Sequence, residues 1–383
     1  MTPVTPTRPA PPDRGHRLRS LHGVVRDPFT RRLLINSDQA IRDLFSADVL
    51  AKCPVHAETT AHIPDGALLR VHNANPLLAD GAHHERLRSL FGLMYKLGGR
   101  HTSAAAASAD AVAQHCRQHP RANVADLARC GALASLSHML GIKPVETESL
   151  MAHARGLSLL TESGGERFSP ELEEQAQHAL AAAENILRFA DRHDPDGWLR
   201  GLRRHEDVDL PAILVIIAMT GFDTTEAFLS STITLTAASD AIQAGLRDGA
   251  SPAAVVRELG RLEAPVQYFG YGAIKDGEIG GRPFHTNDLL SLGFGAACLD
   301  PNRFDDPHVF NPDRTATPSL LFGIGSHKCP GAKLAITVAA TTLSHLTNRF
   351  TLSVDGEVGW SDRIAIRSVA EATIVATPRA PSP

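Results

Sequence analysis

The stretch 321–335 constrains this chain more than any other, because a glycine-rich loop runs directly into one cysteine that begins an apolar helix. Gly323 and Gly325 have no Cβ, so the backbone there can approach something large and flat. Free N–H groups at the start of the helix would hydrogen-bond the sulfur of Cys329 and favour its charged form. Phe322 would shield the sulfur. The loop is therefore predicted to present one thiolate.

A thiolate held in this way suits one axial position of a haem iron. A bare G-x-C fragment would more often be a helix cap with a small buried hydrophobe. The complete run F-G-x-G-x-H-x-C-x-G-x-x-L-A, which begins at Phe322, is far more specific. It resembles the haem-ligand loop of the cytochrome P450 family. The resemblance implies that Cys329 is the axial ligand, that His327 faces a haem propionate, and that Phe322, Gly323 and Gly331 also border haem b.

Composition and charge restrict the remaining classes of protein. The 383 residues suffice for one large domain or two of ordinary size, and 43% hydrophobic residues can bury a sizeable core. A net charge of −4 without a long basic run argues against a general nucleic-acid binder. Five cysteines without a CxxC pair fit a reducing compartment.

Targeting and membrane signals are not expected in this sequence. Residues 1–16 are rich in proline and have no apolar centre, which predicts a disordered arm and no signal peptide. Nowhere do 18 uncharged apolar residues run together, so no transmembrane helix is predicted. We expect a soluble, cytoplasmic protein without membrane contact.

The hydrophobic pattern predicts a mainly α protein with small β-sheets, an α+β chain. Beyond the arm, the pattern is helix-rich over 80–262 and 329–348 and β-rich over 20–36, 266–296 and 350–376. The family resemblance implies that 17–383 form a single cytochrome P450 domain. The family resemblance implies a triangular prism with a long central helix over the haem. Helices are predicted near 38–45, 80–91, 103–117, 124–140, 145–162, 169–192, 196–204, 211–238 and from 251, strands within 24–35 and near 350–354 and 372–376, and a long loop over 51–79.

Polar residues interrupt the long apolar helix at Thr220-Gly221-Phe222-Asp223-Thr224-Thr225. Asp and Thr are poor helix-interior residues, and such local inconsistency often marks a functional site. A bend with satisfied hydroxyls is the alternative. The segment resembles the oxygen-activation segment of the family, usually A/G-G-x-D/E-T-T. The resemblance implies that Gly221 leaves room for dioxygen, that Thr224 donates a hydrogen bond to it, and that Asp223 supplies protons through water.

His84 and Arg88 lie four residues apart and share one face of the predicted helix over 80–91. Taken alone, this pattern would more often be a solvated helix face. The segment resembles the family's D-P-P-x-H-x-x-x-R, with Gly81 and Ala82 in place of the two prolines. The resemblance implies that His84 and Arg88 contact the haem propionates.

Glu258 and Arg261 are three residues apart, so they can pair on one helix face, as many surface pairs do for little energy. The extended segment that follows at Pro265 makes the pattern more specific. It resembles the E-x-x-R helix of the family. There the pair joins an arginine of a later irregular stretch, here Arg314, and the resemblance implies that this triad fixes the loop that holds Cys329.

Two positions depart from the family pattern. Tyr271 stands where an arginine usually binds a propionate, and Ser319 stands where a histidine is common. Both can hydrogen-bond a carboxylate, but a charge-assisted bond is about twice as strong as a neutral one. The haem is therefore expected to depend more on His84, Arg88 and His327, or on another basic residue that the sequence does not identify.

The resemblance implies a haem-thiolate monooxygenase of the soluble bacterial type, which uses dioxygen to hydroxylate or epoxidise a small organic substrate in secondary metabolism. It also implies an external ferredoxin and an NAD(P)H-driven ferredoxin reductase, with Arg86, Lys328 and Lys333 as candidates for the docking face. The alternatives are a peroxide-dependent oxidase of the same fold and a non-catalytic haem- or partner-binding module. The Asp223-Thr224 pair favours dioxygen over peroxide.

Candidate substrate contacts are spread over several segments. They are the loop 54–79, the helix face 213–219 with Val215 and Met219, the segment 266–271 with Tyr268 and Phe269, and a turn near 364–369. The aromatic residues would equally fill the core beside the haem.

Overall fold

The computed structural model describes Leu18 and residues 20–27, 32–52, 63–96, 100–158, 169–193, 208–314 and 319–380, without the side chains of 94–96 and 189–193. The predicted arm 1–16 and the predicted helix 196–204 lie outside these residues. Within the described part, helices dominate and the strands form sheets of five, three and two strands, as expected for a mainly α chain with small sheets.

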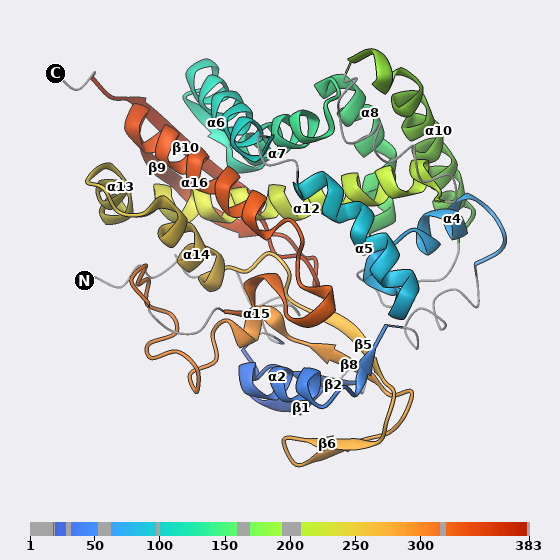
Figure 1. Cartoon of the computed structure of the whole chain (residues 1–383). Coiled ribbons are helices and arrows are strands. Elements are labelled where there is room, and N and C mark those ends of the chain that lie inside the picture. Colours follow the sequence, from blue (N-terminus) through green and yellow to red (C-terminus); the bar gives the residue numbers. More distant parts are fainter. Residues whose placement is uncertain are drawn as a thin grey trace.

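Helix α12, Leu210–Ala237, runs through the middle of the helical part (Figure 1). Almost all of its residues are buried, because it is apolar on nearly every side. Its N-terminus is capped by Asp209, whose carboxylate accepts from the Ala212 N–H at 3.1 Å. By length and composition α12 would suffice to cross a membrane, but 72% of its apolar window is buried inside the protein, as in the core helix of a globular fold.

Helices α7, α8, α10 and α16 pack against α12 in the main core, and α6 packs against α7 and α16 (Figure 1). The predictions over 103–117, 124–140 and 169–192 are confirmed within a few residues, whereas the helix predicted over 145–162 changes to a 3₁₀ turn, Arg155–Ser158, within its described part. The helices are α6 Arg100–Gln118, α7 Val124–Leu140, α8 Pro144–Ala154, α10 Pro170–His193 and α16 Ala332–Arg349.

The predicted long loop over 51–79 is wrong in its described part. It contains α4, Ala67–Asn73, and the 3₁₀ turn Pro76–Leu78. The Glu173 side chain of α10 accepts from the N–H groups of Ala67 at 2.8 Å and Leu68 at 3.0 Å, so the start of α4 is capped by a distant helix. Helix α13, Asp240–Arg247, was likewise not predicted, although Ser239 caps it.

The five-stranded sheet lies against α2, Asp38–Ser46, and has the order β1-β2-β8-β5-β3 (Figure 1). Strands β2 and β8 are parallel, and the other neighbours are antiparallel. Ile41 and Leu44 of α2 pack with Tyr271 and Leu290 in a second core. The strands are β1 Val24–Arg26, β2 Leu33–Ile35, β3 Leu50–Ala51, β5 Phe269–Ala273 and β8 Leu289–Leu292.

The C-terminal sheet has the order β4-β10-β9, and β6 pairs with β7 in a separate hairpin. Strands β9 and β10 exceed the predictions of 350–354 and 372–376, and neither β4 nor the short helix α15, Phe294–Ala297, was predicted. The strands are β4 Arg121–Asn123, β6 Gly277–Ile279, β7 Arg282–Phe284, β9 Phe350–Trp360 and β10 Val369–Pro378.

Helix α14, Pro252–Leu262, and helix α5, Gly81–Lys96, flank the loop that leads to Cys329. Ser251 caps α14, as predicted. A Cβ at Gly260 of α14 would lie 2.6 Å from Phe228 Cε2 and 2.8 Å from Leu321 Cδ2. The missing side chain therefore lets α14 pack closely against both α12 and this loop.

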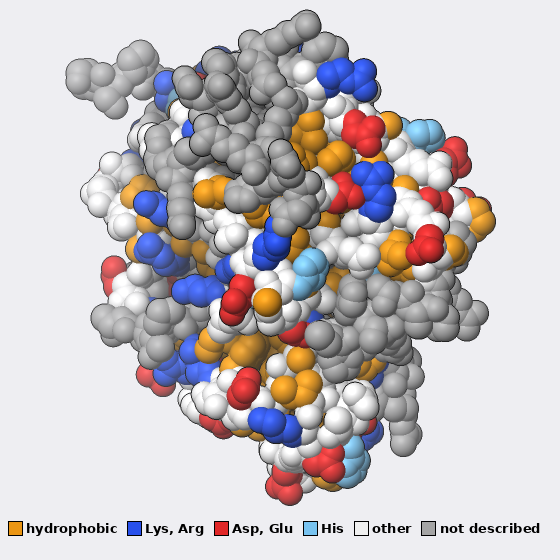
Figure 2. Space-filling model, turned by 45° about the vertical axis from the view of Figure 1, so that its right-hand side comes forward, with side chains coloured by type: hydrophobic (Ala, Val, Ile, Leu, Met, Phe, Trp, Pro, Cys, Tyr) orange, Lys and Arg blue, Asp and Glu red, His pale blue; other side chains and the backbone are white. Residues whose placement is uncertain are grey.

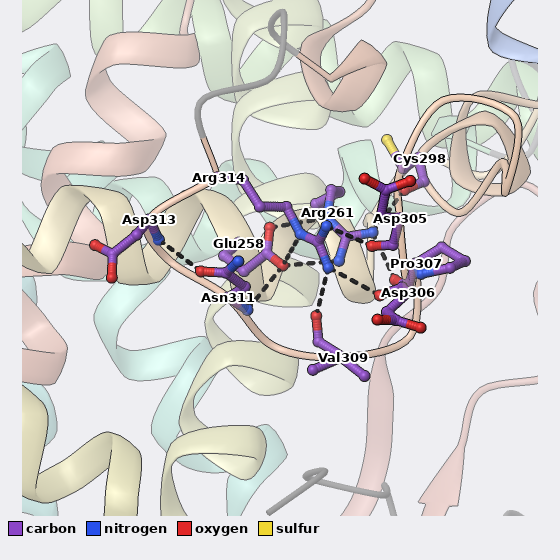
Figure 3. Close-up of polar contacts among 10 residues, drawn as sticks. All are labelled: Glu258, Arg261, Cys298, Asp305, Asp306, Pro307, Val309, Asn311, Asp313 and Arg314. Atoms are coloured by element: carbon purple, nitrogen blue, oxygen red, sulfur yellow. Dashed lines mark hydrogen bonds and ion pairs between the residues drawn. The ribbon is translucent and has the colours of Figure 1, made fainter. Parts of the chain in front are cut away.

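Glu258 and Arg261 of α14 form a bidentate ion pair, with Arg261 Nε 2.8 Å and Nη2 2.7 Å from the two carboxylate oxygens (Figure 3). Arg314 Nε donates to Glu258 Oε1 at 2.9 Å, and the Asn311 N–H donates to the same oxygen at 3.1 Å. The three side chains named from the E-x-x-R resemblance are thus in contact. All are largely buried, so their charges must be satisfied within the group.

The two arginines also hold backbone carbonyls of the irregular stretch before the cysteine loop (Figure 3). Arg261 Nη1 donates to the carbonyls of Cys298 at 2.9 Å and Pro307 at 2.7 Å. Arg314 donates to the carbonyls of Asp305, Asp306 and Val309 at 2.6 to 2.9 Å. One buried ionic group therefore fixes a stretch that has little regular secondary structure of its own.

Substitution Gly260→Ala tests the close approach of α14. The new methyl group has no room, so we expect a loss of about 1–3 kcal/mol in the free energy of unfolding by urea. The control is Gly92→Ala in α5, where a Cβ meets nothing within 4 Å and a gain of roughly 0.5–1 kcal/mol is expected from helix propensity. Equal effects at the two sites would contradict the packing argument.

Substitution Arg314→Ala tests the buried ionic group. Removal of one partner leaves Glu258 partly uncompensated, so the free energy of unfolding should fall by about 3–5 kcal/mol. The matched control is Arg129→Ala, because Arg129 faces Glu148 across 3.7 Å with both side chains exposed, and such pairs contribute about 1 kcal/mol or less. A loss at Arg314 no larger than the loss at Arg129 would refute the structural role.

Candidate active site

The loop before Cys329 is folded tightly on itself. The Cys329 N–H donates to the Phe322 carbonyl at 2.8 Å, which closes the loop. Gly323 and Gly325 have φ of +71° and +70°, a region that residues with a Cβ rarely adopt. Helix α16 then begins at Ala332, directly after the cysteine. The two glycines are therefore required by the turn itself.

The sulfur of Cys329 receives the amides predicted at the helix start, because the N–H groups of Gly331 and Ala332 hydrogen-bond it and lower the pKa of the thiol. Burial acts in the opposite direction and is stronger, so the pKa of Cys329 is raised overall. The predicted thiolate is the form of the sulfur that binds a metal ion, and it stays a prediction. The nearby charge that favours the thiolate comes from Arg88.

Cys329 combines two properties that at first disagree. The residue is exposed, yet enough protein surrounds its sulfur for desolvation to dominate the pKa of the thiol. Both hold because a side chain can face a space that the protein itself encloses.

One face of α12 turns toward this loop. Gly221, Thr224 and Phe228 recur at helical spacing, and the Phe228 ring lies edge-on to the Phe322 ring with centroids 6.3 Å apart. A Cβ at Gly221 would meet only Leu136 Cδ1, at 3.8 Å, so the helix surface is open there. The Thr224 hydroxyl donates to the Thr220 carbonyl at 2.7 Å. The hydroxyl is therefore satisfied within the helix, as the alternative interpretation of this segment expected.

Asp223 is 5% exposed and lies between two arginines from distant segments. Its carboxylate is 3.4 Å from Arg155 Nε and 3.5 Å from Arg363 Nη2. Arg155, in the 3₁₀ turn after α8, also forms an ion pair with Glu226 of α12. The sequence analysis missed both arginines, because neither belongs to a motif and only the fold brings them to α12.

A basic group lies beside the loop. The rings of His84 and His327 are 4.3 Å apart, and Arg88 donates to the Lys328 carbonyl. Burial and the nearby charges of His327 and Arg88 lower the pKa of His84 to about 4, although Asp80 opposes the shift. The structure thus brings together three residues that the resemblance assigned to propionate contact.

Tyr271 and Lys52 complete this group. The Tyr271 ring is buried and lies edge-on to His327, with centroids 6.0 Å apart. The Lys52 ammonium lies 3.4 Å above the centroid of Tyr271. Lys52 was not predicted as a site residue, since a lone lysine after a short strand carries no motif. Ser319 begins the 3₁₀ turn Leu320–Phe322 without a side-chain capping bond.

The proposed substrate contacts lie in different surroundings. Val215 and Met219 are almost fully buried in the main core, and Phe269 lies under Lys52. Tyr268 is partly buried and directly precedes β5. The loop residues 53–62 lie outside the described part of the chain. None of these contacts with substrate is tested by the geometry.

The comparisons with known proteins agree with this geometry. The Cytochrome P450 family model matches residues 253–364. 6-Deoxyerythronolide B hydroxylase of Saccharopolyspora erythraea is 30% identical over 219 residues, which cover 53% of this chain and 54% of that protein. Beta-dihydromenaquinone-9 omega-hydroxylase of Mycobacterium tuberculosis is 29% identical over 180 residues, 46% of this chain and 36% of that protein. The chain thus matches about half or less of the length of these relatives.

Solved structures extend the likeness of fold to nearly the whole chain. The crystal structure of CalO2 matches with a TM-score of 0.83, 22% identity and 95% coverage of both chains. Epothilone B-bound cytochrome P450epoK matches with a TM-score of 0.84, 19% identity, and coverage of 95% of this chain and 96% of that one. At such identities the structures establish the fold alone. Fold, family model and sequence relatives converge, and the chain belongs to the cytochrome P450 family.

Proposed function

We propose that this protein is a haem-thiolate monooxygenase that uses dioxygen to oxidise a small organic molecule. The observation that carries the proposal is the packing of the cysteine loop against α12, because Phe322, whose carbonyl accepts from the Cys329 N–H, lies edge-on to Phe228 on the Gly221–Phe228 face. A thiolate on one side and a helix with an open glycine, a hydroxyl and a buried carboxylate on the other are the groups that such chemistry requires.

The residues present fit iron protoporphyrin IX, the cofactor of this family. Cys329 supplies a sulfur with two amide donors, and Gly323 and Gly221 leave its surroundings free of Cβ atoms. His327 Nδ1 is buried without a hydrogen-bond partner among the described residues, and it belongs to the basic group that would receive the propionates. When bound, haem supplies one-electron and dioxygen chemistry that amino-acid side chains lack.

Thr224 and Asp223 would manage protons at this site. The Thr224 hydroxyl donates to the carbonyl of Thr220, so its oxygen can accept a hydrogen bond from outside the helix, and it would have to turn away from Thr220 to donate one to a ligand. Asp223 makes ion pairs of 3.4 and 3.5 Å to Arg155 and Arg363, longer than tight hydrogen bonds. Consecutive helix residues do not face each other, so protons from Asp223 would reach Thr224 through water.

The class of substrate and the redox partners are the finer part of the proposal. Relatives include a 6-deoxyerythronolide B hydroxylase and a polyketide biosynthesis cytochrome P450 from Bacillus subtilis, which favour a tailoring step in secondary metabolism. Arg86, Lys328 and Lys333 are exposed and remain candidates for a ferredoxin docking face. Figure 2 shows one face of the protein, on which Lys and Arg side chains gather toward the left-hand side.

Substitution Cys329→Ser tests the iron ligand. The purified wild-type protein, reduced and treated with carbon monoxide, should show the long-wavelength Soret band of a thiolate ligand, and the variant should lose it, because a serine oxygen does not replace the sulfur. Cys130→Ser, at a partly buried cysteine in α7, should keep the band. A wild-type spectrum typical of a neutral ligand would refute the central assignment.

Substitution Thr224→Ala tests proton management. With any substrate that shifts the Soret band, product formed through a surrogate ferredoxin and its reductase should fall by about 10²-fold, and electrons should appear as hydrogen peroxide instead. The control is Thr234→Ala, because Thr234 has the same back-bond, 2.8 Å to the Ser230 carbonyl, on another face of α12. Product formation that needs only added peroxide and is insensitive to Thr224 would favour the peroxide-dependent alternative.

A further inference from the structure

Lys52 is a buried cation directly after β3. Its side chain is 1% exposed, which places it among the largest fully buried side chains of the described residues. The ammonium donates to the Gly270 carbonyl and lies 3.4 Å from the ring centroid of Tyr271 and 4.1 Å from that of Phe269. Residues 269 and 271 share one face of β5, so the two rings form a platform under the charge.

This charge has no tight counter-ion within the described residues. No carboxylate there lies within salt-bridge distance of Nζ, and the nearest carboxylate that acts on it is that of Asp80. Asp80 Oδ2 accepts the Lys52 backbone N–H at 2.7 Å, while Oδ1 lies 3.7 Å from His327 Nε2. Burial lowers the pKa of Lys52 well below its usual value, with only a partial offset from Asp80. A buried ammonium in this position is costly until an anion reaches it.

The surroundings of Lys52 are rich in basic side chains. His84, Arg88 and His327 belong to the same group, which holds the carboxylate of Asp80. The Tyr271 ring connects Lys52 with the histidines, because it lies under the Lys52 ammonium and edge-on to the His327 ring. Several buried or half-buried basic groups around one carboxylate make a site for a carboxylate-bearing ligand.

We propose that Lys52 binds a haem propionate and supplies the charge that the Tyr271 position lacks. The inference rests on the haem site proposed above. The rings of Tyr271 and Phe269 orient the ammonium of Lys52. The propionate would form a direct ion pair with this ammonium, which Asp80 stabilises only from a distance. Tyr271 therefore acts as a positioning residue for Lys52, and its own hydroxyl is not needed for charge.

The test compares haem loss from the holoprotein with two forms of haem. Wild type and Lys52→Met are loaded with haem or with haem dimethyl ester, in which both propionates are uncharged, and transfer to excess apomyoglobin is followed by absorbance. With haem, Lys52→Met should lose the cofactor about tenfold faster or more, the effect of removing a hydrogen bond to a charged group. With the dimethyl ester, the two proteins should lose it at equal rates.

Two further variants separate charge from packing. Lys52→Arg keeps the charge and should retain haem within about twofold of wild type. The control Lys275→Met removes an exposed lysine near β5 that donates to the Asp48 carbonyl, and it should change neither rate. If Lys52→Met does not take up haem, Lys52→Gln, which keeps a donor for the Gly270 carbonyl, is compared in its place.

Each outcome bears on one claim. If Lys52→Met also loses the dimethyl ester faster than wild type, Lys52 only supports the packing of Tyr271 and the inference is overturned. If Lys52→Met loses haem at the wild-type rate, the inference is overturned as well. Either result would leave the proposed function standing if wild type shows the thiolate spectrum. A wild-type protein without that spectrum would refute the proposed function itself.

Discussion

The carboxylate of Glu258 is the interaction on which the cysteine loop depends. It receives Arg261 from its own helix, Arg314 from the irregular stretch, and the amide of Asn311. Charges buried this deeply are stable only as a complete set, since removal of one partner leaves the others desolvated. The ionic group is thus a cross-link between a regular helix and the irregular stretch 298–314 that precedes the cysteine loop.

The basic residues around Lys52 differ from the Glu258 group in how their charges are paired. Around Glu258 both arginines are paired with the carboxylate and hydrogen-bonded to backbone carbonyls, whereas no carboxylate of the described residues lies within salt-bridge distance of the Lys52 ammonium. The first arrangement stabilises the fold, and the second stores unfavourable electrostatic energy that a dianionic cofactor would release. The difference between a structural and a binding role is visible here as a difference in charge balance.

Local chemistry decided which parts could be predicted from the sequence. Helix α7 and the start of α14 follow their caps and periodicity, and the loop motif pointed to Cys329 with its helix-start amides. Helix α4 was missed because its cap is the side chain of Glu173, about a hundred residues away. The burial that raises the pKa of Cys329 could not be predicted for a related reason, since burial is a property of the folded surroundings. Lys52 and the arginines around Asp223 could not be predicted as site residues, because only the fold brings their distant segments into contact.

The ion pairs of Asp223 set a limit on how this chain can be recombined with its relatives. Arg155 follows α8, Asp223 lies in α12, and Arg363 precedes β10, so the three come from separate parts of the sequence. A chimaera that exchanges any one of these parts would place a foreign side chain against a buried carboxylate. Crossover points are therefore compatible with this site only where the three positions are inherited together or are matched in charge by the donor.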